Sequence, residues 1–452
     1  MRTIEEFKEE ITQRSQVKAK RNKRRNIAVI STCCLLVVCV VCAAVLIPPR
    51  GPVGRNNYNY TRPEGRDLMA SLKPVALGTK AAPDAGAKEL ADFALKLFKA
   101  TAKDGENTLV SPLSAIAVLG MVANGAGGET LSQMEKVFGL PVDKLNDYLH
   151  SYVGSLPQSA DKYKLDMANS IWFRDDGSLK VNQDFLQKNA DYYGAAAYAE
   201  PFDAETVKNI NDWVKKNTDG MIEEIIDDIN PSEVMHLINA LAFDAYWETP
   251  YKSHQLLNTT FNGRHGSTDK VLMMNSTESV YYSGEGFEGV GKPYKDGKYS
   301  FVALLPEMGS SVEDLVSSLD GAKLYEILSS PQKEFRVETQ IPKFEIEYEA
   351  QLGDALKAMG MKDLFDSDLA DLSGIGRSAA GKLFIGSVIQ KTYISVDENG
   401  TKAAAATDAI AYATGFDPNL RFVILDRPFL YMLVDNQTNT PFFIGTVMDI
   451  EK

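Results

Sequence analysis

Residues 398–415 read ENGTKAAAATDAIAYATG, and this stretch says more about the chain than any other. Its alanine content alone would favour a helix. With the two-residue period of a strand, however, every bulky or charged side chain falls on one face, at Lys402, Asp408, Ile410 and Tyr412. The opposite face holds only small side chains, at Thr401, Ala403, Ala405, Thr407, Ala409, Ala411 and Ala413. Such a segment can slip into a packed sheet as a central strand, and the weak strand propensity of alanine keeps it from pairing earlier.

Further motifs follow one another from about residue 88 to the C-terminus. They read NTLVSPLS at 107–114, NGAGGET at 124–130, LINA at 237–240, WETP at 247–250, DLSGI at 371–375, VILDRPFLYML at 423–433 and PFFIG at 441–445. Together with 398–415, and in this order, they resemble the serpin family of serine protease inhibitors. Residues 107–130 resemble the family's first long helix and the turn after it, and 237–250 resembles a central strand and its exit.

The resemblance implies an α+β serpin fold, with helices packed around three antiparallel or mixed β-sheets and an exposed reactive-centre loop. Residues 85–452 are long for one ordinary domain but have the usual size for this fold. Alternating polar and apolar residues at 335–341 and 343–348 predict half-buried strands, and the pattern at 207–216 predicts an amphipathic helix. The sequence therefore predicts a single serpin domain over 85–452.

The resemblance also implies a mechanism, in which the protein is a suicide substrate. A serine protease attacks the loop and becomes esterified to it, and the released loop enters the main sheet as a new strand. Thirteen or fourteen inserted residues carry the enzyme ~45 Å at ~3.3 Å per residue, which distorts its active site before water can release it. The hinge of this movement is expected at Glu398, Gly400, Thr401, Ala403, Ala404, Ala405 and Ala406.

The cut bond is expected between Thr414 and Gly415, the seventeenth residue of the loop counted from Glu398 and the residue after it. Ala413 is the nearest alternative, and a count back from Arg427 points instead to the neighbourhood of Asp417. Arginine and lysine are absent between 403 and 420, so trypsin-like proteases are poor targets. Small residues before the bond favour elastase-like or subtilisin-like enzymes.

The positions that let the sheet part are assigned by the same resemblance. Ser111, Ser114 and Asn239 correspond to a polar cluster beneath the sheet, and Trp247 to the aromatic residue where the loop first enters. The family often has a histidine eight residues before the hinge glutamate, whereas this chain has Gln390. Glutamine can still donate and accept hydrogen bonds, but it cannot gain a charge near neutral pH.

The N-terminus predicts a membrane-spanning helix. Residues 27–47 carry no charge over 21 positions, which at ~1.5 Å per residue is enough helix to cross a ~30 Å hydrocarbon layer. Six basic residues between Lys18 and Arg25 place the tail 1–26 in the cytoplasm and the following domain outside the cell. A cleaved signal peptide is the alternative, although the apolar run is longer than a usual signal peptide's.

Residues 48–84 are rich in Pro, Gly and Asn and predict a flexible linker with a reach of roughly 35 Å. The serpin domain is thus expected at the cell membrane on a single-pass anchor, or shed or secreted from it. All four cysteines lie within 27–47, so no disulfide is expected in the domain. The shortage of cysteine and the short basic tail are typical of a bacterial surface protein.

Charge excludes several classes of partner. Residues 1–26 carry a net charge of +5 and residues 48–84 one of +3. Because the whole chain carries −13, residues 85–452 carry −21. An acidic domain is a poor candidate for binding nucleic acid, heparin-like polymers or anionic lipid. We expect no cofactor, and no metal because the four histidines never pair at ligand spacing. The expected partners are serine proteases and, through the N-terminal helix, the membrane, with the inhibitor domain a monomer and not an enzyme.

A second class of function stays open, because some serpins bind or carry ligands without inhibiting a protease. Such members tend to have bulky, charged or proline residues in the hinge, whereas this hinge is nearly all small. Five Asn-x-Ser/Thr sequons also match the pattern for N-glycosylation, and one of them is Asn399 within the hinge. A branched sugar there would obstruct the loop, so we expect Asn399 to be unmodified.

Overall fold

The computed structural model describes residues 65–75, 77, 86–155, 163–218, 220–229, 233–379, 381–401 and 417–450. The predicted tail 1–26, spanning run 27–47 and cut bond at Thr414 and Gly415 lie outside these residues, as do Ala403, Ala404, Ala405, Ala406 and Ala413. None of the described helices is long and apolar enough to span a bilayer.

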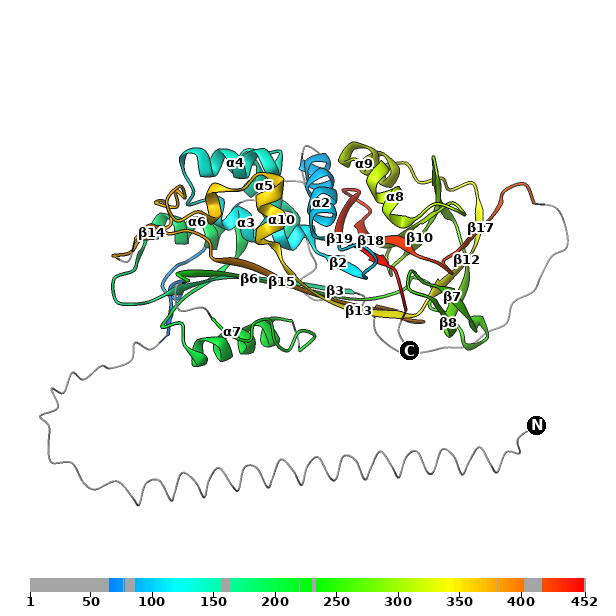
Figure 1. The fold of residues 1–452 in the computed structure, drawn as a ribbon, viewed down its shortest axis with the longest axis horizontal. Coiled ribbons are helices and arrows are strands. Elements are labelled where there is room, and N and C mark those ends of the chain that lie inside the picture. The colour runs from blue at the N-terminus through cyan, green and yellow to red at the C-terminus, as the bar shows by residue number, and fades with distance from the viewer. Residues whose placement is uncertain are drawn as a thin grey trace, which may run out of the picture. The chain divides into compact units, whose positions relative to one another are not determined.

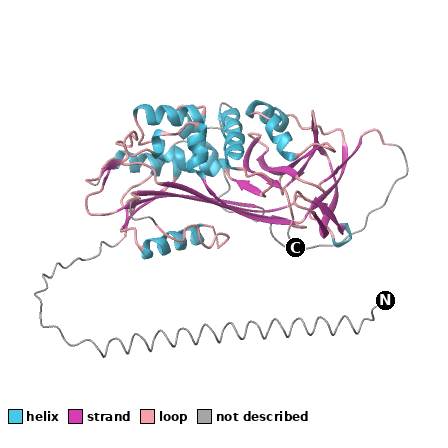
Figure 2. Ribbon diagram, in the orientation of Figure 1, coloured by secondary structure: helices cyan, strands magenta, loops and turns pink. Residues whose placement is uncertain are grey.

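Nine α-helices and two 3₁₀ turns are described (Figures 1 and 2). They are α2 Ala87–Thr101, α3 Pro112–Ala123, α4 Gly128–Phe138, α5 Val142–Ser155, α6 Gln183–Tyr193, α7 Ala204–Asn217, α8 Val312–Ser318, α9 Gly321–Ser329, α10 Leu352–Met359, η2 Ser253–Gln255 and η3 Asp363–Phe365. Local chemistry sets their ends. Ser111 caps α3 by accepting a hydrogen bond from Ser114 N, and Asp203 forms a capping box with Thr206 at the start of α7.

The largest sheet, sheet A, holds the strands that matter for function. Its order is β1 Arg66–Asp67, β5 Ala196–Glu200, β3 Tyr163–Arg174, β6 Met235–Tyr246, β15 Ser387–Val396 and β13 Phe344–Gln351, and β16 Gly400–Thr401 pairs with β6 off this path. Strands β6 and β15 are parallel, while β6 is antiparallel to β3 and β15 to β13. Sheet A is therefore mixed, as expected.

Two further sheets complete the body. Sheet B runs β2 Thr108–Val110, β19 Thr440–Val447, β18 Phe429–Asp435, β11 Tyr299–Pro306, β10 Phe287–Pro293 and β9 Val280–Gly284. Sheet C runs β17 Leu420–Ile424, β12 Arg336–Pro342, β8 Ser267–Glu278 and β7 Leu256–Asn262, and a short ribbon pairs β14 Gly376–Arg377 with β4 Lys180–Val181. Every residue of β11, β18 and β19 is buried, so these central strands of sheet B are covered on both faces and are largely apolar.

Sheet A is covered differently on its two faces. Figure 1 shows α7 alone on one face, with the other helices on the opposite side of the sheet. Ile238 and Ala240 of β6 and Ile389 of β15 belong to the smaller apolar cluster beneath α7. Leu237 and Leu241, the alternate residues of β6, face the main core instead. A strand that entered sheet A would therefore have to fit a packed layer on each face.

The structure agrees with most predicted elements and shifts two boundaries. The strands expected at 335–341 and 343–348 are β12 and β13, and the predicted amphipathic helix is α7. In the motif at 107–114, however, residues 108–110 form β2, the helix begins only at Pro112, and the longer α2 precedes it. Proline at the first helical position and a serine cap are the local signals that set this start.

The second shift concerns the linker predicted over 48–84, because its residues 65–75 pack on the domain. Arg66 and Asp67 pair with β5, and Arg66 Nη2 lies 2.6 Å from the Asp175 carboxylate. The backbone of Lys73 and Val75 is held by side chains of α6. The chain thus joins sheet A about 20 residues before the expected start of the domain. Proline and glycine around this segment hid it, since a two-residue edge strand leaves no periodic pattern.

Candidate functional site: the seam between β6 and β15

Strands β6 and β15 are paired over six residues each, out of 12 in β6 and 10 in β15. Their parallel register runs from Ser387 opposite His236 to Thr392 opposite Leu241. Beyond that point β15 continues with β13 as far as Val396, and β6 continues with β3 as far as Ala245. In the described part of the chain, only β16 occupies the seam that opens between them.

The hinge residues already turn into this seam. Asp397 N donates to Gly400 O at 2.9 Å, which reverses the chain after β15. Gly400 and Thr401 then pair antiparallel with Tyr246 and Ala245 of β6. Gly400 has a φ of +151°, and a Cβ on it would collide with the carbonyl oxygen of Ala245. Only glycine fits this position, because the backbone approaches β6 too closely for a side chain.

Two aromatic residues hold the carbonyls of the hinge turn. Trp247 donates from its backbone N to Asn399 O and from Nε1 to Asp397 O, both at 2.9 Å. Tyr251 N donates to Glu398 O at 2.7 Å. The carbonyls of Asp397, Glu398 and Asn399 thus all accept hydrogen bonds before the loop begins.

Glu398 itself is fixed from the side by Lys343, whose Nζ donates to Oε2 at 3.0 Å. Partial burial alone would raise the pKa of Glu398, but hydrogen bonds from the backbone and from Lys343 hold this pKa below its usual value. Glu398 is therefore ionised at neutral pH. The ion pair joins the start of β13 to the end of β15 at the top of the seam.

Below the seam lies a buried polar cluster that joins sheet A to α3. Gln390 accepts from Ser111 N and donates to Ser111 O, both at 2.9 Å, and Ser111 Oγ donates to Phe442 O at 2.9 Å. Asn239 stands beside Gln390 in register and donates to the Oδ1 of Asn169 on β3. The cluster thus fastens β15, β6 and β3 to one another and to the helix beneath them.

Ser114 Oγ and Asn239 Oδ1 are buried and have no hydrogen-bond partner among the described residues. A buried acceptor without a partner costs on the order of 1–3 kcal/mol. These two atoms therefore reduce the stability that the polar cluster adds between α3 and sheet A.

The structure brings together Ser111, Ser114, Asn239 and Gln390, and it places Trp247 at the far end of β6 beside Glu398, Gly400 and Thr401. Their role in opening the sheet stays a prediction. Sequence reasoning missed Asn169, Lys343 and Tyr251 in these networks. Asn169 is 70 residues from its partner Asn239, so no local pattern could connect them. A basic residue directly before the alternating run at 344–351 was the available signal for Lys343.

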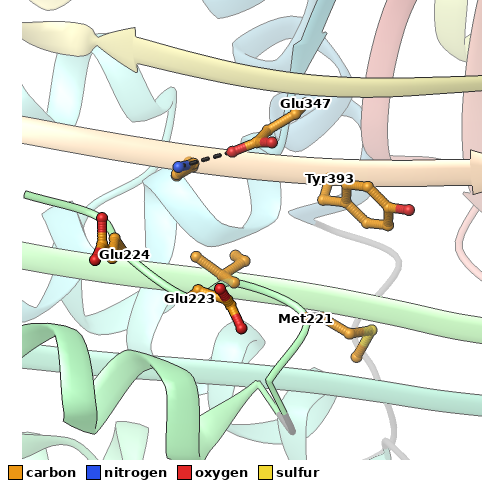
Figure 3. A pocket seen from close by; sticks show the side chains of 7 residues that line it. Met221, Glu223, Glu224, Glu347 and Tyr393 are labelled. Atoms are coloured by element: carbon orange, nitrogen blue, oxygen red, sulfur yellow. Dashed lines mark ion pairs between the residues drawn. The ribbon is translucent and has the colours of Figure 1, made fainter. Parts of the chain in front are cut away.

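On the α7 face of sheet A, a cavity of about 350 Å³ lies between the chain that follows α7 and strands β13 and β15. Figure 3 shows Glu223 and Glu224 on one side of it and Glu347 and Tyr393 on the other. Lys391 pairs with Glu347 at 2.7 Å. No group of acidic, histidine or cysteine side chains in the described residues is placed to hold a metal ion. The cavity shows that the chain after α7 does not lie flat on the sheet here.

Sheet A is thus a mixed sheet with a half-open seam, and Gly400 and Thr401 turn into that seam. A model of the serpin family, described as serine protease inhibitor, matches residues 88–450. The chain therefore belongs to the serpin family, a family of protease inhibitors rather than of enzymes.

Individual relatives agree with this assignment. Over 376 residues the chain is 31% identical to leukocyte elastase inhibitor A of Mus musculus, covering 78% of this chain and 97% of the relative. It is 42% identical to the thermophilic serpin tengpin solved in the native state, with a TM-score of 0.82 over 86% of this chain and 100% of tengpin. The latent state of tengpin gives 41% identity and a TM-score of 0.73 over 83% of this chain and 100% of tengpin. Thyroxine-binding globulin in complex with thyroxine is 23% identical, with a TM-score of 0.72 over 81% of this chain and 99% of the globulin, and so shares the fold.

Proposed function

We propose that this serpin inhibits serine proteases as a suicide substrate, trapping the enzyme when its cleaved loop enters sheet A between β6 and β15. The observation that carries the proposal is the seam, where β16 has already paired two hinge residues with β6. A strand that continues from Thr401 would run antiparallel to β6, alongside Leu241 to Phe243. This strand would pair with the backbone N–H and C=O groups that β6 and β15 do not offer to each other in the seam.

The chemical step is ordinary acyl transfer. The protease serine attacks the carbonyl carbon of the residue before the cut bond, the peptide C–N bond breaks, and the amine of the next residue leaves with a proton. The ester that remains ties the enzyme to the loop. Insertion then carries it ~45 Å along the sheet, at ~3.3 Å per residue.

The native and latent structures of tengpin support a sheet in this chain that has not yet accepted its loop. The chain fits the native state of that relative better than the latent state, with TM-scores of 0.82 and 0.73. The half-open seam is consistent with the same conclusion. Both observations support a form of the protein that could still react with a protease.

We place the cut between Thr414 and Gly415 and expect an elastase-like or subtilisin-like target, on the small residues that precede the bond. Leukocyte elastase inhibitor A, 31% identical, carries the name of such an enzyme. We also propose that residues 27–47 anchor the protein as a single-pass helix, with a monomeric domain outside the cell. The uncharged 21-residue run and its basic flank support the anchor.

The test is to mix full-length protein with pancreatic elastase, subtilisin or trypsin at equal molar ratio. We expect an SDS-resistant complex with at least one of the first two and a released C-terminal fragment that begins at Gly415. Trypsin should cleave after Lys402 and form no complex, because no basic residue follows until Arg421. If no elastase-like or subtilisin-like enzyme is trapped, the proposal fails.

A non-inhibitory role as a surface binding or carrier protein is the second candidate. Thyroxine-binding globulin has the same fold, and its solved complex shows that a serpin can hold a small molecule. In that case each protease that cleaves the loop would stay active, and no mixture would contain an SDS-resistant complex. The small residues of this hinge favour inhibition.

A further inference from the structure

Beneath the hinge lies an ion pair that the inhibitory mechanism does not itself require. Lys292 of β10 is 1% exposed, and its Nζ lies 2.6 Å from Oε1 of Glu278 on β8. A buried ion pair contributes little net stability, because desolvation of the two charges offsets their attraction. Burial accordingly lowers the pKa of Lys292 despite the neighbouring carboxylate. The position of this ion pair is therefore more informative than its contribution to stability.

The Lys292 ammonium lies against both aromatic residues that hold the hinge. Its Nζ is 4.4 Å from the ring centroid of Tyr251 and 5.5 Å from that of Trp247. Both distances are within the range of a cation–π interaction, which is stronger where water is excluded. Trp247 and Tyr251 are 1% and 2% exposed. One cation thus orients the Trp247 indole, whose Nε1 donates to Asp397 O, and the Tyr251 ring. The backbone N–H groups of the same two residues donate to Asn399 O and Glu398 O.

The surroundings leave the ion pair and the two rings little freedom to rearrange. Trp247 stacks on Tyr294 with ring centroids 4.5 Å apart. Ser276 Oγ lies 2.6 Å from Glu278 Oε1 and 3.3 Å from Tyr251 Oη, which links the carboxylate to the same aromatic ring. For the hinge to leave its turn, the donors of Trp247 and Tyr251 must separate from it, and the cation resists their movement.

We propose that Lys292 is a positioning residue for the inhibitory reaction: through Tyr251 and Trp247 it holds the hinge turn closed and so sets how fast the uncleaved loop enters sheet A. This inference rests on the proposed insertion of the loop. It assigns to β10 and β8, which lie outside sheet A, control over the lifetime of the active form.

The test removes the cation without leaving an unpaired charge. Full-length K292M/E278Q is incubated at elevated temperature beside the unsubstituted protein, and its remaining capacity to trap elastase or subtilisin is titrated over time. All proteins in this comparison carry W172F and W213F, so that tryptophan fluorescence in the same samples reports Trp247 and shows opening even where no protease is trapped. We expect both signals to change on the order of tenfold faster in the variant, as loss of a cation–π contact of about 1.4 kcal/mol implies.

Two further variants separate positioning from general packing. K292R keeps a cation over the rings, so its active form should last as long as that of the unsubstituted protein. If Lys292 acted only through packing, K292R and K292M/E278Q would open at similar rates. K96M/D92N removes an exposed Lys–Asp pair on α2 and should change nothing. If K292M/E278Q does not fold, Y251L serves instead, because it removes the ring nearest the cation and leaves both charges; it too should open faster.

The inference would be overturned if K292M/E278Q opened at the same rate as the unsubstituted protein. The same holds for Y251L where that variant is used. If the fluorescence change is accelerated but no protease is ever trapped, the positioning role stands and the inhibitory function fails. If protease is trapped and the opening rate is unchanged, the inhibitory function stands and the positioning role fails.

Discussion

Gly400 makes the hinge possible at the scale of a single residue. Its backbone lies so close to the Ala245 carbonyl that any side chain would force the turn away from β6. The following residue, Thr401, is the register partner of Ala245, which is fully buried. The position where the loop enters sheet A is therefore tightly packed before any insertion has taken place.

The first prediction concerns Thr401→Arg. Burial of an unpaired guanidinium costs several kcal/mol, so insertion should stall at its first step and the ester should hydrolyse before the protease is distorted. The variant should be cleaved without forming a covalent complex, as measured by titration of elastase and gel electrophoresis. Lys402→Arg, one residue later and on the charged face of the loop, is the control and should trap enzyme normally. A fully inhibitory Thr401→Arg variant would contradict the two-faced interpretation of the loop.

The second prediction concerns the sequon at Asn399. Its side chain is only 3% exposed, which leaves no room for a branched sugar in the folded protein. We expect intact-mass analysis of protein made in a glycosylating host to find Asn399 unmodified. Asn258, in an exposed part of β7, is the internal control for a sequon that the host can reach. An active inhibitor with sugar on Asn399 would contradict the steric argument.

The third prediction is a pH dependence of stability carried by His236, which lies beside Ser387 where β6 and β15 are still paired. Burial lowers the pKa of His236 to about 4, although Glu233 lies 3.0 Å from its Nε2. The unfolded chain, with a histidine pKa near 6.5, binds the proton more readily, so stability should fall as the pH decreases from about 6.5 towards 4. The loss between pH 7 and pH 5 should be on the order of 2 kcal/mol.

Thermal unfolding across this pH range measures the effect. His236→Gln should flatten the profile, whereas His254→Gln, which alters an exposed histidine, should leave it unchanged. With Gln390 in place of the histidine often found in the family, His236 is the buried histidine at this seam. An equal pH dependence in both variants would show that other groups carry it.

At the scale of elements, the fourth prediction concerns β1, the edge strand that the sequence had assigned to a linker. Arg66 neutralises Asp175, whose side chain is only 7% exposed, while Arg66 itself is 57% exposed. Arg66→Ala should destabilise the domain by about 2 kcal/mol, since it leaves a nearly buried carboxylate without its cation. Lys96→Ala, which breaks an exposed pair on α2, should cost less than about 0.5 kcal/mol.

The same elements show what could be read from the sequence. Strands β12 and β13 and helix α7 carry strong periodic patterns, so their prediction was correct. The hinge stays a prediction, which rests on small residues that alternate in a way that no ordinary strand needs. The contacts of Asn169, Lys292 and Tyr251 were not visible, because each residue meets partners that are distant in the sequence and no local pattern records such contacts.

At the scale of the whole molecule, the proposed mechanism requires that the native form, with its half-open seam, is not the most stable arrangement of this chain. A strand inserted between β6 and β15 would add backbone hydrogen bonds on both sides and close the opening above Thr392. The fifth prediction is therefore that cleavage of the loop raises the unfolding temperature. Because one strand affects the cooperative unfolding of all of sheet A, the increase should be large, well above the few degrees of a single favourable substitution.

Calorimetry before and after limited cleavage by subtilisin measures this change, with Thr401→Arg as the matched control. That variant is cut at the same bond but should gain much less, since its hinge cannot enter the sheet. An unchanged or lower unfolding temperature in the cleaved unsubstituted protein would mean that the loop does not insert. The pairing of β16 with β6 would then be a structural turn, and a binding role would become the better account of this serpin.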